Sequence, residues 1–241
     1  MLKGNKARAL LAVGALLAAG PVIAAGAAPE QKGTNRAAAA GKESEQSQAV
    51  SQRVLAYQLA NWGKANNDPQ ALILAAKMLN NAPASDNGPQ GTNQPQKGAP
   101  AAGQPPASTK PAITTASLLG EARTMANGDR YVLQQASLVE GSASKGVVDG
   151  PFDYYRDIAA RTVYSIDFTA RAGEVLRVGA AGDGDTDVDI RLIDGNGNVV
   201  CQDLDRDPWG VCAVTPAWTG RFRLQVINNG NVWTRTHIVT N

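Results

Sequence analysis

The second half of the chain alternates apolar and polar residues in short runs. "TVYSIDF", "VDIRLID" and "GRFRLQVIN" place apolar side chains at every second position, and glycine-rich turns separate the runs. This alternation is typical of strands with one buried face and one solvated face. No segment of helix length interrupts the later runs, so the pattern predicts an antiparallel β-sandwich over residues 129–241.

The first half shows helical spacing instead. "KANNDP" separates two amphipathic stretches, and Asp68 followed by Pro69 is a typical helix start. The apolar positions of the two stretches are Val54, Leu55, Leu59, Trp62, Leu72, Ile73, Ala76 and Leu79. The pattern predicts a helical hairpin over residues 48–82, with Trp62 as a core residue that seals it. A platform for a ligand is the alternative role of Trp62.

The remaining segments complete a mainly β protein with a short helical region and disordered linkers. Residues 112–128, "TTASLLGEARTMANG" with flanks, predict one more short helix. Residues 83–111 are rich in proline, glycine and glutamine and predict a disordered or partly extended linker. Residues 28–47 lack apolar periodicity and predict a flexible leader.

The first residues indicate export. Lys3, Lys6 and Arg8 precede a short apolar run, and a small-residue "AGA" pattern follows it, which is typical of a secretory signal peptide over residues 1–27. No later segment is apolar enough to span a membrane, so we expect a periplasmic or secreted protein. Signal removal takes three of the 23 basic residues and leaves 20 against 21 acidic ones. This balance argues against a nucleic-acid partner, which needs a basic surplus.

The two cysteines, Cys201 and Cys212, predict a disulfide, because an even pair close in sequence pairs in an oxidising compartment. Unrelated buried thiols are the alternative. The absence of a CxxC spacing leaves redox catalysis and a four-cysteine zinc site without support.

The catalytic inventory favours a protein that is not an enzyme. The sequence holds one histidine, His237, in a predicted strand at the chain end, where we expect a surface or paired-edge residue. Neither HExxH nor GxSxG occurs. Paired carboxylates are the remaining route to catalysis, and they need a cleft and a raised pKa.

Two acidic loops are candidate calcium ligands. "GDGDTDVDIRLID" departs from the EF-hand pattern because Val188 stands where that loop requires glycine. Pairing of the strands that follow would bring the two loops to one end of the sandwich, where a hard cation would relieve carboxylate repulsion. The candidate ligands are Asp183, Asp185, Asp203 and Asp205. The alternative is that these aspartates only form turns, a role common for Asp.

The stretches "TVYSIDFTARAGEVLRV", "GDTDVDIRLIDGNGNVV" and "TPAWTGRFRLQV" resemble the bacterial pre-peptidase C-terminal domain, a secreted jelly-roll-like β-sandwich. The resemblance covers about residues 129–241 and implies a module usually attached to extracellular proteases. It also implies that the pair Asp187 and Asp189 ties down neighbouring loops. The chain departs from the pattern because no peptidase precedes the domain, the cysteine pair is unusual, and the last strand lacks a tyrosine.

These observations together predict an exported, non-catalytic binding module that contacts a polymer or a protein in the envelope or extracellular space. The candidates for flat contacts on the exposed sheet face are Trp209, Trp218, Trp233 and Tyr155. For each of them taken alone, packing in the core or in a loop is the favoured alternative. Two alternatives stay open: an accessory in the secretion or maturation of a partner enzyme, as the resemblance suggests, and a carboxylate-dependent hydrolase. No cofactor other than calcium is expected.

Overall fold

The computed structural model describes residues 32–99, 110–142 and 150–241. The predicted signal peptide, residues 1–27, lies outside these ranges, so its prediction stays untested. Residues Gly33–Asn241 form one compact unit. Within the described ranges, no helix combines the length and the apolar character that a membrane crossing needs.

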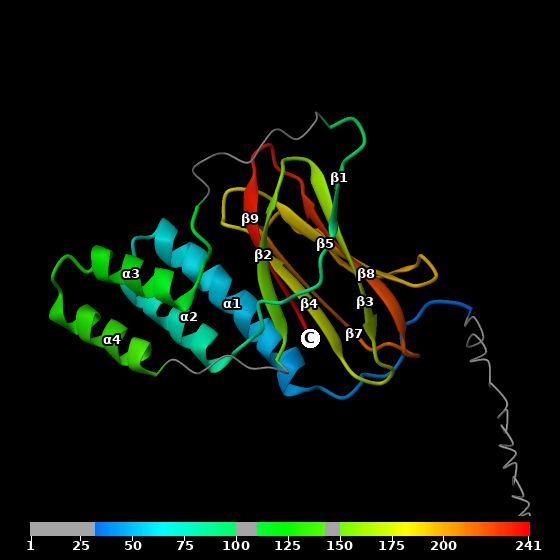
Figure 1. The fold of residues 1–241 in the computed structure, drawn as a ribbon, viewed down its shortest axis with the longest axis horizontal. Helices are drawn as coiled ribbons and strands as arrows, with labels where there is room; N and C mark the ends of the chain where they lie inside the picture. The colour runs from blue at the N-terminus through cyan, green and yellow to red at the C-terminus, as the bar shows by residue number, and fades with distance from the viewer. Residues whose placement is uncertain (1–31, 100–109, 143–149) are drawn as a thin grey trace, which may run out of the picture. The chain divides into compact units, whose positions relative to one another are not determined.

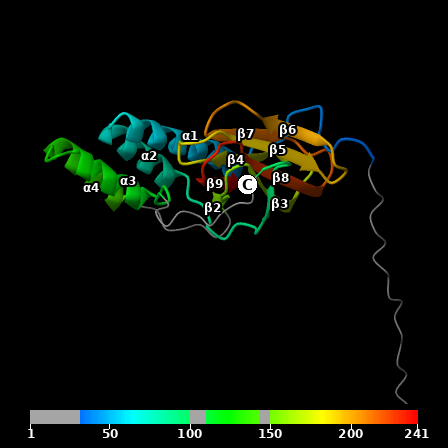
Figure 2. The same ribbon diagram turned by 90° about the horizontal axis from the view of Figure 1, so that it is seen from above.

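Four helices form the first part of this unit, and each begins at a side chain that caps its free N–H groups. The helices are α1 (Glu45–Ala65), α2 (Pro69–Asn81), α3 (Thr115–Met125) and α4 (Arg130–Gly141). Ser44, Asp68, Thr114 and Asp129 are the caps. Figures 1 and 2 show α2, α3 and α4 on the side of α1 that faces away from the strands.

The buried side of α1 differs from the one that the sequence predicts. Val50, Val54 and Tyr57 follow each other at helical spacing and are almost completely buried. Leu55 and Trp62, predicted as core residues, are 54% and 53% exposed. The cause is that α1 packs on α2 and on the strands at once, and both contacts use its other faces.

Helix α4 corrects the predicted start of the sandwich at residue 129. Val132, Ala136 and Val139 are buried and lie on one helical face, against α2 and α3. The first strand of this half begins only at Phe152. The i, i+4, i+7 spacing of the three buried residues was the signal for a helix.

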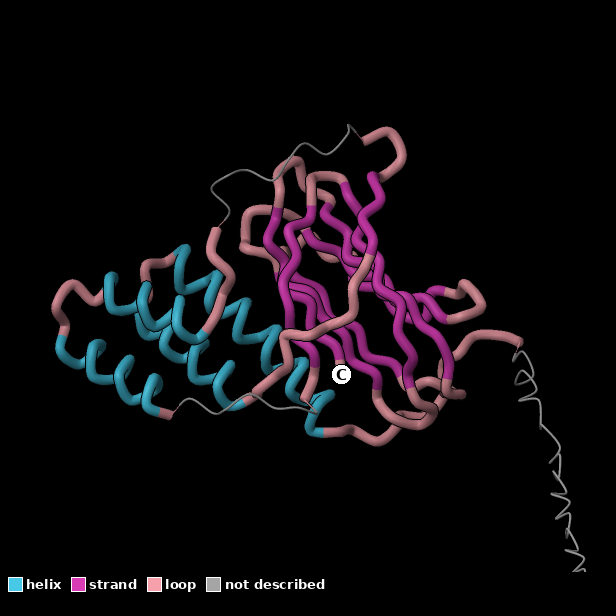
Figure 3. Tube along the Cα trace, in the orientation of Figure 1, coloured by secondary structure: helices cyan, strands magenta, loops and turns pink. Residues whose placement is uncertain are grey.

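In residues 32–99, 110–142 and 150–241, nine strands form two antiparallel sheets, which confirms the predicted fold class. Figure 3 shows the strands beside the helices. The strands are β1 (Thr92–Pro95), β2 (Phe152–Ile158), β3 (Thr162–Ala170), β4 (Leu176–Ala181), β5 (Val188–Asp194), β6 (Val199–Asp203), β7 (Trp209–Val214), β8 (Gly220–Asn228) and β9 (Thr234–Thr240). The five-stranded sheet has the order β1-β3-β8-β5-β6 and the four-stranded sheet the order β2-β9-β4-β7. Ile166, Ile190, Phe222, Leu224 and Ile238, all apolar members of the alternating runs, are almost completely buried between them.

A disulfide joins the two sheets at one edge. Cys201 on β6 and Cys212 on β7 are bonded, as the sequence predicts. Since β6 and β7 are edge strands of different sheets, the bond closes that side of the sandwich covalently.

The predicted flexible leader is wrong for residues 33–44, which lie against one end of the sandwich. The backbone N–H of Asn35 donates to the Asp194 carboxylate at 2.7 Å. The Asn35 side chain donates to the backbone carbonyl of Trp218 at 2.9 Å and accepts from its N–H at 3.0 Å. A hydrophobicity pattern misses such a segment because polar bonds hold it, and Asn35 itself is buried.

The predicted linker is wrong for part of residues 83–111. Strand β1 pairs with β3, although all four of its residues are exposed. At Gly88, an added Cβ atom would stand 1.7 Å from the Tyr154 ring, so the segment before β1 presses directly on the sandwich. Backbone hydrogen bonds and close approach hold this segment, and neither needs apolar side chains.

Helix α1 lies on the outer face of the four-stranded sheet. At Gly179 on β4, an added Cβ atom would stand 2.5 Å from a methyl group of Val54. Val239 and Ala181, from the two central strands, belong to the same apolar cluster as α1. The helices and the sandwich therefore share a core.

Candidate functional site

The outer face of the four-stranded sheet carries a row of side chains that borders two cavities. Across the strands, Tyr155, His237, Ala181 and Trp209 stand opposite one another in that order. One cavity, of about 670 Å³, reaches the His237 end of the row, and another, of about 510 Å³, reaches the Trp209 end. Helix α1 contributes residues to both cavities.

His237 is the centre of a buried polar cluster. Its Nδ1 lies 3.1 Å from an oxygen of Asp153, and its ring stacks on Tyr57 with centroids 4.1 Å apart. The second Asp153 oxygen accepts hydrogen bonds from Arg53 and from the Tyr57 hydroxyl. On the far side of the ring, Nε2 accepts a hydrogen bond from the backbone N–H of Ile113 at 3.2 Å.

The charges of this cluster stabilise one another. Burial opposes ionisation of Asp153, yet the hydrogen bond with His237, the charge of Arg53 and the hydrogen bond from Tyr57 lower its pKa to about 2. Burial also opposes the charge on Arg53, but Asp153 holds the pKa of this guanidinium above its ordinary value. Burial and the nearby carboxylate raise the pKa of Tyr57, which therefore stays a neutral donor.

The predicted surface or edge position of His237 is wrong. Strand β9 lies between β2 and β4, and His237 is only 5% exposed. Both ring nitrogens have partners, an acid on one side and a backbone amide on the other. The pair His237–Asp153 therefore joins α1, β2, β9 and the chain before α3. The Ile113 N–H occupies the position on Nε2 that a nucleophilic hydroxyl would take.

The second cavity, which we call the junction cleft, lies between α1 and the sandwich. Its walls combine two tryptophans and two prolines with amide, ammonium and carboxylate groups. Trp62 on α1 is exposed and Trp209 on β7 is half-buried. The lining residues are Gln58, Asn61, Trp62, Lys64, Ala65, Lys110, Pro111, Ile113, Asp183, Gly184, Pro208 and Trp209.

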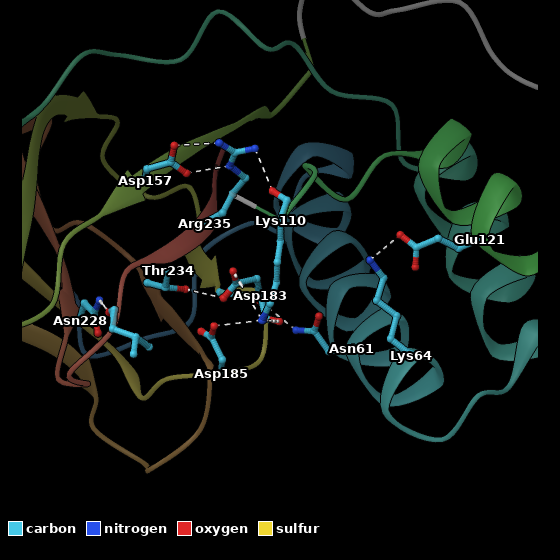
Figure 4. Close-up of polar contacts among 12 residues, drawn as sticks. Asn61, Lys64, Lys110, Glu121, Asp157, Asp183, Asp185, Asn228, Thr234 and Arg235 are labelled. Atoms are coloured by element: carbon cyan, nitrogen blue, oxygen red, sulfur yellow. Dashed lines mark hydrogen bonds and ion pairs between the residues drawn. The ribbon is translucent and has the colours of Figure 1, made fainter. Parts of the chain in front are cut away.

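Lys110 lies at the rim of the junction cleft between two carboxylates (Figure 4). Its ammonium lies 3.0 Å from Asp185 and 3.8 Å from Asp183, whose other oxygen accepts from the Thr234 hydroxyl at 3.0 Å. Burial and the neighbouring Asp185 raise the pKa of Asp183. Burial also acts on Asp185, but hydrogen bonds to Asp183 and Lys110 lower its pKa. The pair thus divides into a more basic and a more acidic carboxylate.

Residues Lys110–Thr114, which we call the strap, form one wall of the cleft. Arg235, clasped by Asp157 through two hydrogen bonds of 2.7 and 2.8 Å, donates to the Lys110 carbonyl at 2.9 Å (Figure 4). Further along, the Ile113 N–H bonds to His237. The strap therefore lies along β9 at two points, and α3 follows directly after it.

The predicted calcium ligands do not meet in one site. Asp183 and Asp185 lie around Lys110, whereas Asp203 accepts hydrogen bonds from the backbone N–H groups of Val211 and Asp205, at 3.0 and 3.4 Å. In the part of the chain that the structure describes, no group of three or more His, Cys, Asp or Glu side chains is placed to hold a metal ion. The two acidic loops were expected to meet through strand pairing. Instead, Lys110 serves the first loop and backbone N–H groups serve the second.

The predicted aromatic contacts do not share a face. Trp209 lies in the junction cleft, but Trp218 precedes β8 and Trp233 follows it, so these two lie at opposite ends of the sandwich. Tyr155 is exposed beside His237, with the Arg235 guanidinium 4.9 Å above its ring.

The sequence pattern favours a core role for Trp62 over a ligand contact, and it misses the strap as part of a site. Trp62 fits the helical period of α1, so the pattern assigned it to the core. The strap has no periodicity, and its site role comes from contacts with residues more than 100 positions away. In the sequence, a lysine beside prolines looks the same in a site as in a linker, so Lys110 could not be recognised as a site residue.

Comparisons with known proteins leave the family open. No family model matches the chain, and no curated protein matches it. Among solved structures, the chain is similar to the pre-peptidase C-terminal domain of a collagenase from Bacillus anthracis, with 10% identity over 39% of this chain and 80% of that chain and a TM-score of 0.22. It is also similar to the enzymatically active domain of tailspike protein 4 of bacteriophage CBA120, with 13% identity over 37% of this chain and 15% of that chain and a TM-score of 0.24. These superpositions are too loose to assign a family or an activity.

Proposed function

We propose that this chain is an exported, non-catalytic binding module and that its ligand is a polymer chain bound in the junction cleft. The observation that carries the proposal is the pairing of an exposed indole, Trp62, with a second indole, Trp209, in a cleft of about 510 Å³ that also holds polar groups. Ligand sites typically combine apolar walls with a few polar groups that orient the ligand.

The chemistry of the walls favours a polysaccharide. Sugar rings present flat C–H faces, which stack on aromatic rings, and hydroxyl edges, which need donors and acceptors. Gln58, Asn61 and Lys110 supply such groups beside the two indoles. A peptide polymer is the competing ligand, and the test below separates the two.

Three further observations support the proposal. The bonded cysteine pair is typical of proteins that fold in an oxidising compartment, as export predicts. The histidine that a hydrolase would use has both nitrogens engaged. The strand sequences that resemble a pre-peptidase C-terminal domain also favour a module without activity of its own.

Binding of the purified exported chain to polymers tests this function. We expect retention on an insoluble cell-wall or storage polysaccharide, and about tenfold weaker binding by Trp62→Ala, since a stacked aromatic residue dominates such an interface. Leu55→Ala is the matched control, because Leu55 lies on the same helix, is equally exposed and lies outside the cleft. We expect it to bind as the unaltered chain does.

Two outcomes would contradict the proposal. Equal loss in Trp62→Ala and Leu55→Ala would show that the contact is nonspecific and apolar. Retention on collagen-like or other peptide polymers, with none on polysaccharides, would show that the ligand is a peptide and not a polysaccharide.

A further inference from the structure

The strap is held by the one histidine of the sequence. The Ile113 N–H donates to Nε2 of His237 at 3.2 Å, and Ile113 itself is buried and lines the junction cleft. Lys110 and Pro111 of the strap line the same cleft. The position of this cleft wall is therefore coupled to a side chain whose hydrogen-bonding character depends on its protonation.

The geometry defines the protonation state that the closed strap requires. A backbone N–H is only a donor, so Nε2 must carry a lone pair and the ring proton must lie on Nδ1, which faces Asp153. A second proton on His237 would turn Nε2 into a donor that points at another donor. The bond to Ile113 exists only while His237 is neutral.

The groups around His237 limit what else changes with pH. Asp153 and Tyr155 face it from β2, Arg53 and Tyr57 from α1, and Arg235 lies on the same face of β9. Asp86 and Arg156 line the same cavity as His237. The low pKa of Asp153, about 2, keeps this carboxylate charged under mildly acidic conditions and next to an imidazolium. The ring therefore has a counter-ion for its charged form inside the cluster.

We propose that protonation of His237 releases the Ile113 end of the strap from β9, while Arg235 still holds Lys110, and that this widens the junction cleft, so that ligand binding there weakens in acid. The effect on the ligand rests on the function proposed above, whereas release of the strap does not. The strap-released state accepts a proton that the closed state excludes, so acid shifts the population toward release. Loss of one hydrogen bond to a cleft wall predicts about fivefold to tenfold weaker binding at about pH 5 than at about pH 7.5.

Nuclear magnetic resonance of the intact chain tests the release directly. With one histidine, the imidazole signals need no assignment by mutation. We expect the Nδ1–H tautomer at neutral pH, and an Ile113 amide signal that shifts and exchanges faster with the same midpoint as His237. An Nε2–H tautomer at neutral pH, or an Ile113 amide unchanged while His237 titrates, would overturn the proposal.

The variant His237→Gln tests whether the pH response comes from His237 or from a nearby carboxyl group. Glutamine places an uncharged acceptor near the position of Nε2 and does not titrate, so we expect the strap to stay closed and binding to lose its dependence on pH. Asp183, whose pKa is raised, also lies next to the strap through Lys110. If binding still depends on pH in His237→Gln, the responsible group is Asp183, and the proposal for His237 is refuted.

The two proposals fail in different ways. Absence of polysaccharide binding at neutral pH would remove the proposed ligand but leave the release measurable through the Ile113 amide. Binding that is equally tight at both pH values would remove the pH control and leave the ligand in place. If His237→Gln does not fold, the tautomer and amide measurements on the unaltered chain still decide.

Discussion

Two polar clusters, one on the outer face of the four-stranded sheet and one beside the loop that follows β4, differ in burial. In the Asp153 cluster, Asp153 is almost completely buried, and Arg53, Tyr57 and His237 donate to its two oxygens. In the Lys110 cluster, one half-exposed ammonium serves both Asp183 and Asp185. The first is a neutralised network inside a core, and the second is a shared charge at the rim of a cleft.

The comparison indicates that burial and hydrogen-bond satisfaction decide the role of a charge. A buried charge with every partner in place stabilises the fold, because removal of one partner leaves the other charges buried without compensation. A half-exposed charge with several weak partners exchanges them at low cost, as a binding site needs. The predictions below test this contrast, from the largest expected effect to the smallest.

Replacement of Asp153 should have the largest effect. Asp153→Ala leaves the Arg53 guanidinium buried without its carboxylate, which we expect to lower the free energy of unfolding by about 3–5 kcal/mol. Denaturant unfolding followed by tryptophan fluorescence measures it. Asp167→Ala is the control, because it removes an exposed pair with Arg223, bonded at 2.7 and 2.9 Å, and should cost less than about 1 kcal/mol. Equal losses in the free energy of unfolding of the two variants would contradict the difference between buried and exposed charges.

Loss of the disulfide should come next. The paired replacement Cys201→Ala and Cys212→Ala frees a loop with a sequence separation of 11 and should destabilise the chain by about 3 kcal/mol, mainly through the unfolded state. Thermal unfolding with and without a reductant measures this. The unaltered chain should be two hydrogens lighter before reduction than after it. Free thiols in exported material would contradict both the bond and the compartment.

Acid should then destabilise the chain through Asp153. Because its pKa falls from an ordinary 3.8 to about 2, its contribution is present above about pH 4 and is lost as the pH falls toward about 2. The loss amounts to about 2 kcal/mol across this window. A urea titration series should show it, and the part that comes from Asp153 should be absent in Asp153→Ala. A flat profile between these pH values would mean that Asp153 is not paired as described.

Calcium should have the smallest effect. Since the Lys110 ammonium already lies between Asp183 and Asp185 and offsets part of their charge, we expect millimolar calcium to leave the melting temperature unchanged. The sequence alone predicts a rise instead. If calcium raises the melting temperature and the double variant Asp185→Asn with Asp205→Asn abolishes the increase, calcium binds there. Calcium would then displace the Lys110 ammonium from the carboxylates.

The sequence predicts the sandwich well because its information is local. Each of the strands at Thr162–Ala170, Val188–Asp194 and Gly220–Asn228 alternates through its own length, and each is buried on the side that the alternation indicates. The cysteine pair was predictable for the same reason. Its two residues lie close in the chain, and their chemistry leaves few alternatives.

Features that depend on distant residues were not predictable. The burial of His237 follows from β9 pairing with β2 and β4 and from coverage by α1. The exposure of Trp62 follows from which two faces of α1 the rest of the fold covers. Strand β1 has no apolar pattern and owes its place to hydrogen bonds with β3. Single-chain patterns carry no information about such pairings.

The position of β9 also bears on when the protein folds. Strand β9 comes last of the strands described and joins β2 to the pair formed by β4 and β7, so the four-stranded sheet is complete only once β9 is in place. Such pairings between distant segments form late, because the intervening chain must first be closed into a loop. The strand order therefore makes assembly of the four-stranded sheet a late step in folding, which follows the pairing of strands that lie earlier in the chain.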